Sequence, residues 1–203
     1  MRLFLVRHGE TESNRRGLAL GRDDVPLNER GLWQAERLGR ALAPEPLAAV
    51  YSSPLRRTLD TARAVASPHG VDVQTEERLV EMDIGEADGL TFEEVRSRFP
   101  GLLEAWVSDK GPTQAMPGGE RLLDVQERAW SAIADLAARH NEETVAAVTH
   151  NFVILTLLVR VLGLDLVQFR RLRHSVGAVS VLDTRPKRFT LVRLNDTCHL
   201  EGD

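Results

Sequence analysis

The sequence predicts an α/β fold, a three-layer sandwich in which helices cover both faces of a mostly parallel sheet. The first observation is that short apolar runs alternate with longer helical patterns along the chain. The second is that several of these runs are apolar almost throughout, as strands buried on both faces are. The third is length, because 203 residues can bury roughly 70% of the unfolded surface in one core. We therefore expect a single domain over residues 1–203.

The expected strands are the short apolar runs. In chain order they cover Leu3–Val6, Ala48–Ser52, Val71–Gln74, Val145–Thr149, Val176–Leu182 and Phe189–Leu194. The first, second and fourth runs are nearly continuous, which is typical of strands inside a parallel sheet.

The expected helices are the longer patterns, in which apolar residues recur every three to four positions. They cover Glu29–Leu42, Pro54–Ala66, Arg121–Arg139 and Phe152–Leu162. Residues 82–118 contain no clear strand pattern. We therefore expect a helical excursion over the site there.

Helix start patterns support several of these assignments. Ser53 before Pro54 predicts an N-cap followed by the first helical residue. Asn28 and Asn151 occupy positions where an N-cap is expected. The segment Thr91–Glu94 has the pattern of a capping box, which predicts a short helix in the excursion.

Composition excludes several function classes. The chain has 26 basic and 30 acidic residues, a net charge of −4, which argues against a protein that coats nucleic acid or an anionic membrane. The single cysteine, Cys198, can form neither an intrachain disulfide nor a cysteine-based zinc site, and no phosphate-binding arginine loop follows it. No run approaches the ~20 apolar residues of a membrane span. The chain opens on a strand-like run without a signal-peptide pattern, so we expect a cytoplasmic protein.

Basic side chains follow three of the predicted strands. The first strand leads into Arg7 and His8, the second into Arg56 and Arg57, and the fourth into His150. Ligands of open α/β sheets bind outside the carboxyl ends of the strands, and helix N-termini there favour anions. Each feature alone has an ordinary structural explanation, such as a hydrogen-bonded histidine or a solvated arginine. Together they predict one anion site, most simply for a phosphate.

The order of motifs then resembles a known family. Arg7-His8-Gly9-Glu10-Thr11 after an apolar strand resembles the hallmark of the histidine phosphatase superfamily, in its phosphoglycerate mutase-like branch. The resemblance continues through Gly21 to Ala35, Ser53-Pro54-Leu55-Arg56-Arg57-Thr58, Leu79-x-Glu81, Pro117-Gly118-Gly119-Glu120 and Val148-Thr149-His150. These matches span about residues 2–160 in the family's order. The resemblance implies a phosphoglycerate mutase-like fold.

The resemblance also implies roles for individual residues. His8 matches the family's nucleophilic histidine, which is phosphorylated during turnover. Arg7, Arg57 and His150 match the phosphate clamp, in which His150 is expected to act as a cation. Asn14 lies where the family often supplies an amide to the phosphate or to the region of the nucleophile.

Glu81 matches the general acid of the family, for which burial near phosphate anions should raise the pKa. Asp83 is the local competitor, because it would share Glu81's side of an extended segment. The resemblance implies no metal and no cofactor. Asp23 and Asp24 could be interpreted as a magnesium site, although Asp24 fits a turn residue better.

Departures from the family pattern concern substrate recognition. Leu20 stands before Gly21 where relatives commonly carry a polar residue that contacts substrate. Asn151 and Phe152 replace a usual glycine pair after the second histidine. Leu20, Gly21 and Asn151 are therefore the candidate substrate-binding residues.

The favoured function is a metal-independent phosphatase that hydrolyses small phosphomonoesters through a phosphohistidine. One alternative is a phosphoglycerate mutase, which Leu20 and the absence of an adjacent arginine pair between Glu81 and His150 disfavour. Others are a more specific α-ribazole phosphatase or phosphoserine phosphatase, and a non-catalytic phosphate-binding module. The resemblance also leads us to expect a homodimer, and whether His199 in the C-terminal tail reaches the site is left open.

Overall fold

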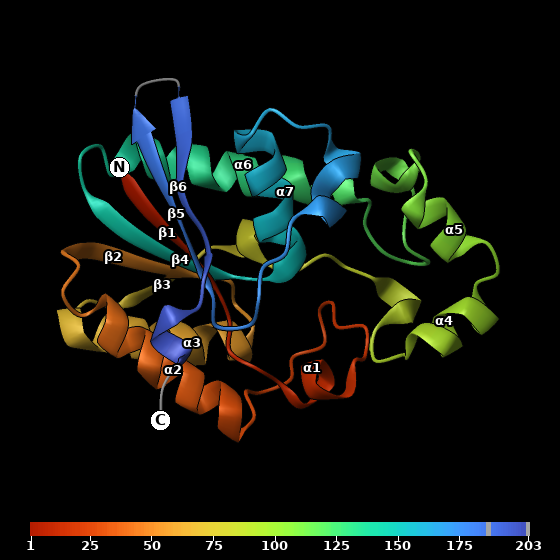
Figure 1. The fold of residues 1–203 in the computed structure, drawn as a ribbon, viewed down its shortest axis with the longest axis horizontal. Helices are drawn as coiled ribbons and strands as arrows, with labels where there is room; N and C mark the ends of the chain where they lie inside the picture. The colour runs from red at the N-terminus through yellow and green to blue at the C-terminus, as the bar shows by residue number, and fades with distance from the viewer. Residues whose placement is uncertain (186–187, 202–203) are drawn as a thin grey trace.

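The computed structural model describes residues 1–185 and 188–201 of the chain. They form a six-stranded sheet with the order β3-β2-β4-β1-β5-β6 (Figure 1). The strands are β1 Arg2–Arg7, β2 Leu47–Ser52, β3 Val73–Thr75, β4 Thr144–Thr149, β5 Val179–Arg185 and β6 Arg188–Asp196. The first four run parallel to one another, whereas β5 pairs antiparallel both with β1 and with β6. The predicted α/β fold is confirmed, with a mixed sheet, because too few residues separate β5 from β6 for a parallel crossover.

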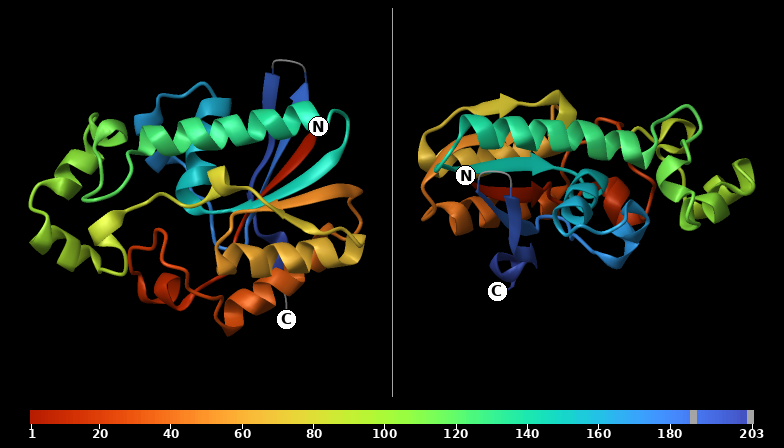
Figure 2. Two further views of the ribbon diagram at one scale, coloured as in Figure 1. Left: turned by 180° about the vertical axis from the view of Figure 1, so that it is seen from behind. Right: turned by 90° about the horizontal axis from the view of Figure 1, so that it is seen from above.

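Helices cover both faces of this sheet (Figure 2). The α-helices are α1 Glu12–Arg16, α2 Glu29–Leu42, α3 Arg56–Ala66, α4 Phe92–Arg98, α5 Leu102–Val107, α6 Leu122–Arg139 and α7 Asn151–Val161. Short 3-10 helices cover Ser67–His69, Glu77–Leu79, Gly85–Ala87, Gly111–Thr113, Leu166–Arg171 and Cys198–Leu200. None of the described helices combines the length and the hydropathy of a membrane-spanning segment.

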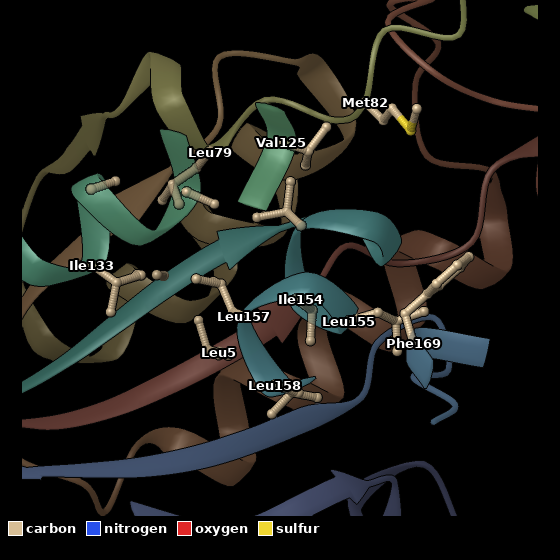
Figure 3. Packing of buried hydrophobic residues seen from close by; sticks show 14 of the residues in the cluster. Leu5, Leu79, Met82, Val125, Ile133, Ile154, Leu155, Leu157, Leu158 and Phe169 are labelled. Atoms are coloured by element: carbon tan, nitrogen blue, oxygen red, sulfur yellow. The ribbon is translucent and has the colours of Figure 1, made fainter. Parts of the chain in front are cut away.

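The two faces of the sheet bury two separate apolar clusters. Phe4 and Val6 of β1 point to the face that α2 and α3 cover, where Leu38 and Val65 lie. Leu3 and Leu5 of the same strand point to the opposite face, against α6 and α7. Figure 3 shows Leu5 there among the side chains of Ile133, Ile154 and Leu157. This double burial explains why the strand is an unbroken apolar run.

The segment of residues 82–118 contains α4 and α5 but no strand, and the structure describes all of it. Both helices lie beyond one end of the sheet, on the same side as α1 (Figures 1 and 2). Backbone hydrogen bonds connect the two parts, from Ala19 to the Leu90 carbonyl at 2.8 Å and from Gly89 to the Ala19 carbonyl at 2.9 Å. The loop after α1 is thereby fixed to the start of this segment.

Two predicted helix starts are wrong by one or two residues. α3 begins at Arg56, and Leu55 precedes it without a side-chain cap, because the hydroxyl of Ser53 contacts His150 instead. At α7 the N-cap is His150, so Asn151 is the first helical residue. The other cap predictions hold: the Asn28 side chain accepts from Gly31 at 2.8 Å, and the capping box at Thr91 forms.

Candidate active site

Neighbouring parallel strands bring the expected site residues to one edge of the sheet. Arg7 at the end of β1 lies opposite Thr149 at the end of β4. The backbone N–H of His8 donates to the Thr149 carbonyl at 3.1 Å. This places the rings of His8 and His150 5.2 Å apart, at an interplanar angle of 61°. Together with Arg57 and Glu81, these two histidines and Arg7 form what we call the strand-end cluster.

The tautomer of His8 is fixed by the backbone. The ring is 2% exposed, and its Nδ1 lies 2.7 Å from the Gly9 carbonyl oxygen. A carbonyl oxygen only accepts, so Nδ1 carries the proton and Nε2 keeps its lone pair. Burial, followed by the charges of Arg57 and Arg7, lowers the pKa of His8 well below its usual value. The ring is therefore neutral at pH 7, with Nε2 able to act as a nucleophile.

Arg57 is a fully buried cation whose guanidinium is held by backbone carbonyls. Nη1 donates to Asp23 and Nη2 donates to Gly21, both at 2.7 Å. Burial lowers its pKa, although an arginine remains protonated at neutral pH. The third guanidinium nitrogen, Nε, is buried without a hydrogen-bond partner.

The guanidinium of Arg7 is held in a similar way. Its Nη1 donates to Oδ1 of Asn151 at 3.0 Å and also to the His174 carbonyl. Burial lowers the pKa of Arg7 to about 10. Its Nε is likewise buried without a partner. Because buried donors are usually satisfied, two such groups in one place indicate a site for an anion.

His150 adds a third unpartnered atom to this place. Its Nε2 lies 2.8 Å from the hydroxyl of Ser53, and its Nδ1 is buried without a partner. Burial, then the charges of Arg57, His8 and Arg7, lower the pKa of His150 well below its usual value. The ring is thus neutral here at pH 7. The cationic form that we expected from the resemblance requires an anion beside it, which would raise this pKa.

Glu81 is a buried carboxyl group at 3% exposure. Oε1 accepts from the N–H of Met82 at 2.9 Å, and Oε2 accepts from that of Phe152 at 3.3 Å. Burial raises the pKa of Glu81, an effect that these hydrogen bonds and the two cluster arginines only partly oppose. The local competitor, Asp83, instead accepts from Gly85 at 2.9 Å within its own turn. The geometry therefore favours Glu81 as the proton donor.

An ion pair that the sequence did not reveal holds the segment that carries Glu81. Arg128 of α6 donates from Nε and Nη2 to the Glu120 carboxylate at 3.0 and 3.1 Å. Its Nη1 donates to the carbonyls of Arg78 and Val80 at 2.8 and 2.6 Å, and Nη2 reaches the Glu81 carbonyl at 3.1 Å. The one available indication was an arginine on the buried side of a helix, in register with Val125 and Ala132.

The other expected residues lie at the border of the cluster. Oδ1 of Asn14 accepts from the N–H and hydroxyl of Thr11 in the capping box of α1. The N–H of Gly21 donates to Asp88 at 2.9 Å, and an added Cβ would approach the Met82 carbonyl to 2.8 Å. Gly21 therefore shapes the Arg57 contact through its backbone.

Two hollows border the candidate substrate-binding residues and differ in character. What we call the outer cavity has a volume of about 500 Å³ and borders Arg7, Asn14 and Asn151. A smaller cavity of about 120 Å³ is lined almost entirely by apolar side chains, including Leu20 and Trp106. Leu20 thus faces an apolar space, and Asn151 contributes to the polar one besides orienting Arg7.

In the described part of the C-terminal tail, His199 is connected to the cluster through one backbone link. Nε2 of His199 lies 2.9 Å from the Gly177 carbonyl, and the N–H of Gly177 donates to the His8 carbonyl at 3.0 Å. Gly177 has φ +68°, a left-handed conformation that suits glycine. His199 therefore supports the loop before β5 and does not contact the rings of the cluster.

The residues that could suggest a metal site have other contacts. Oδ1 of Asp24 accepts from the backbone of Arg56 at 2.7 Å, and the Asp23 carbonyl accepts from Arg57. Among residues 1–185 and 188–201, no three His, Cys, Asp or Glu side chains are grouped to hold a metal ion.

Comparison with known proteins agrees with this geometry. The family model described as histidine phosphatase superfamily (branch 1) matches residues 3–197. Phosphoserine phosphatase 1 of Hydrogenobacter thermophilus is 35% identical over 98% of this chain and 94% of its own length. Among solved structures, Bacillus stearothermophilus YhfR superimposes with a TM-score of 0.91 at 32% identity, covering 98% of this chain and 99% of that chain. A mycobacterial glucosyl-3-phosphoglycerate phosphatase complexed with VO3 has a TM-score of 0.88 at 30% identity, covering 97% and 99%.

The chain therefore belongs to the histidine phosphatase superfamily, as its motif order predicted. Its fold is the phosphoglycerate mutase-like one of these structures. The family and its phosphatase-named members identify the chain as a phosphoric monoester hydrolase.

Proposed function

We propose that this protein is a metal-independent phosphatase that hydrolyses small phosphomonoesters through a phosphohistidine on His8. The observation that carries the proposal is the set of buried, unpartnered atoms Arg7 Nε, Arg57 Nε and His150 Nδ1 around one neutral imidazole. A phosphoryl group supplies oxygen acceptors for all three. Phosphoserine and glucosyl-3-phosphoglycerate, named for two relatives, are both phosphomonoesters, which supports this substrate class.

In the first step, the Nε2 lone pair of His8 attacks phosphorus. The P–N bond forms while the bond from phosphorus to the ester oxygen breaks. The protonated carboxyl of Glu81 donates its proton to the departing alkoxide, so the alcohol leaves neutral. A raised pKa keeps this carboxyl protonated at higher pH than usual, as the role requires.

In the second step, the Glu81 carboxylate takes a proton from water as the water oxygen attacks phosphorus. The P–N bond breaks, its electron pair returns to Nε2, and inorganic phosphate leaves. Both the carboxyl proton and the neutral imidazole are restored. Two displacements thus replace a single difficult one.

The clamp stabilises the charge on the phosphoryl oxygens in both steps. Arg7 and Arg57 are cations before any ligand binds, and the phosphoryl group itself favours a protonated His150. Buried guanidiniums in fixed positions supply the charge that a metal ion would otherwise provide.

One observation separates hydrolysis from mutase chemistry. A mutase must keep phosphoglycerate bound while it reorients and must hold the phosphohistidine against water. Leu20 lines an apolar cavity with Ile84 and Trp106, so the position before Gly21 offers no hydrogen-bond donor to a reorienting substrate. We therefore expect water to be the acceptor.

The test is a phosphomonoester panel assayed in excess EDTA. It includes p-nitrophenyl phosphate, phosphoserine, and 3-phosphoglycerate with a bisphosphoglycerate primer. We expect inorganic phosphate to be released without added metal. Loss of turnover in EDTA, restored by a divalent metal, would contradict metal independence. Formation of 2-phosphoglycerate many times faster than phosphate would identify a mutase.

A further inference from the structure

The outer cavity carries a cation that the phosphate chemistry does not use. Its charged lining side chains are Arg7, Arg173 and Glu10. Arg7 belongs to the strand-end cluster, where its guanidinium is already held by Asn151 and the His174 carbonyl. Arg173 is exposed and makes no hydrogen bond or ion pair within the described residues.

Arg173 belongs to a basic run with Arg170 and Arg171, and each of the three arginines has a different environment. Arg170 is bound to the end of α5, donating to the carbonyls of Trp106 and Val107 at 2.7 and 2.6 Å. Arg171 is exposed and does not line the outer cavity. Only Arg173 of these three lines it, and its charge helps to lower the pKa of Arg7.

The backbone beside Arg173 is firmly placed. The His174 carbonyl accepts from Arg7, and the His174 ring contacts the Ser180 hydroxyl at 2.9 Å. The N–H of Ser175 donates to the side chain of Asn195 at 2.6 Å. The guanidinium of Arg173 therefore extends from a fixed point at the edge of the phosphate clamp.

The acidic group of the cavity does not neutralise Arg173. Oε1 of Glu10 accepts from the side chain of Asn28 at 2.8 Å. Its Oε2 lies 3.9 Å from Nε of Arg30. Both oxygens of Glu10 are thus directed to the start of α2, which leaves Arg173 without a counter-charge.

We propose that Arg173 binds a carboxylate on the leaving group of the substrate, so that the natural substrate is a phosphorylated small acid. A planar guanidinium matches the two oxygens of a carboxylate. One unpaired cation balances one carboxylate, whereas a second phosphate dianion would leave excess negative charge beside Glu10. The inference rests on the proposed function, because it assigns the phosphoryl group to the strand-end cluster.

The test compares 3-phosphoglycerate with glycerol 3-phosphate, which differ by a carboxylate in place of a hydroxymethyl group. The variants are Arg173→Gln and the matched control Arg171→Gln. We expect wild type to prefer the acid in kcat/KM. Arg173→Gln should lower kcat/KM for the acid about tenfold more than for the alcohol, mainly through KM. Arg171→Gln should keep the wild-type preference, and Arg173→Lys should restore part of it.

Equal losses on both substrates in Arg173→Gln, or a wild type without preference for the acid, would overturn the proposal. A preference for fructose 1,6-bisphosphate over fructose 6-phosphate that Arg173→Gln removes would assign the subsite to a second phosphate instead.

Calorimetry separates a failure of the subsite from a failure of catalysis. In a His8→Ala background no turnover is expected, and the acid should bind about tenfold more tightly with Arg173 than with Gln at this position. Binding that ignores this change contradicts the subsite even if the enzyme is a phosphatase. If binding depends on Arg173 while the wild-type protein hydrolyses no phosphomonoester, the proposed function alone is contradicted.

Discussion

The strand-end cluster and the outer cavity hold their charged groups in opposite ways. In the cluster, Arg57 is 0% and Glu81 3% exposed, and backbone groups fix both side chains. In the outer cavity, Arg173 is exposed and only its backbone is fixed. Electrostatic interactions are strong in the buried cluster and screened in the open cavity. The cluster therefore suits the reaction itself, and the cavity suits discrimination between leaving groups.

Among substitutions in the two regions that leave His8 in place, the largest loss of activity should come from a change at Glu81. We expect Glu81→Gln to lower kcat/KM for alkyl phosphates about a thousandfold, because their alkoxides need a proton in order to leave. For p-nitrophenyl phosphate the loss should be about tenfold or less, since nitrophenolate is a good leaving group. Steady-state assays of both substrates check this. An equal loss on both would count against Glu81 as the acid.

The pH dependence of kcat/KM should report the shifted pKa values of the buried cluster residues. Glu81 has a raised pKa and acts when protonated, so kcat/KM for alkyl phosphates should fall as the pH rises through that value. The fall should lie at higher pH than for an ordinary carboxyl. His8 has a lowered pKa, so protonation of the ring should reduce activity only below its usual value near 6.5. Glu81→Gln should lose the fall in kcat/KM at alkaline pH that wild type shows on the same substrate. If the fall persists in the variant, it reports the titration of another group.

A smaller effect should come from Arg128, which positions Glu81 without touching substrate. Arg128→Met removes the contacts to Glu120 and to the carbonyls of residues 78, 80 and 81. We expect about a tenfold loss on alkyl phosphates and less on p-nitrophenyl phosphate. Arg121→Met, which breaks an exposed ion pair with Asp124 at the start of the same helix, should change neither by more than about twofold.

A uniform loss on both substrates in Arg128→Met would mean that Arg128 serves only general stability. Circular dichroism should show that the variant is folded. If it is not, Glu120→Gln weakens the same ion pair more gently and gives the same comparison of leaving groups.

Sequence patterns predicted the features that depend on residues close together in the chain. The apolar run before Arg7 and His8 predicted a buried strand with polar groups at its end, and the structure has that strand at Arg2–Arg7. Motif order located Glu81 and His150, which the structure brings to the same cluster. The boundary at Ser53 was predicted wrongly because its hydroxyl contacts His150, a residue distant in the chain, and so does not cap α3.

The features that the sequence did not predict depend on contacts between segments distant in the chain. The ion pair of Arg128 with Glu120 joins a helix to a turn, and its hydrogen bonds reach a segment almost fifty residues earlier. Nothing local marks Arg173 among its neighbouring arginines, because the cavity that distinguishes it is formed by α1, α4, α7 and the loop before β5. Leu20 likewise acquires its apolar surroundings from residues distant in the chain, such as Leu102 and Trp106 of α5.

The central claim is that His8 carries the phosphoryl group during turnover. Wild type is mixed rapidly with a phosphomonoester labelled on phosphorus and quenched in base, which preserves a phosphohistidine. We expect up to about one label per chain, released by acid, located on His8, and absent from folded His8→Ala, which should also lose turnover. A wild type that turns over without any labelled protein, together with a His8→Ala variant of normal activity, would contradict the account.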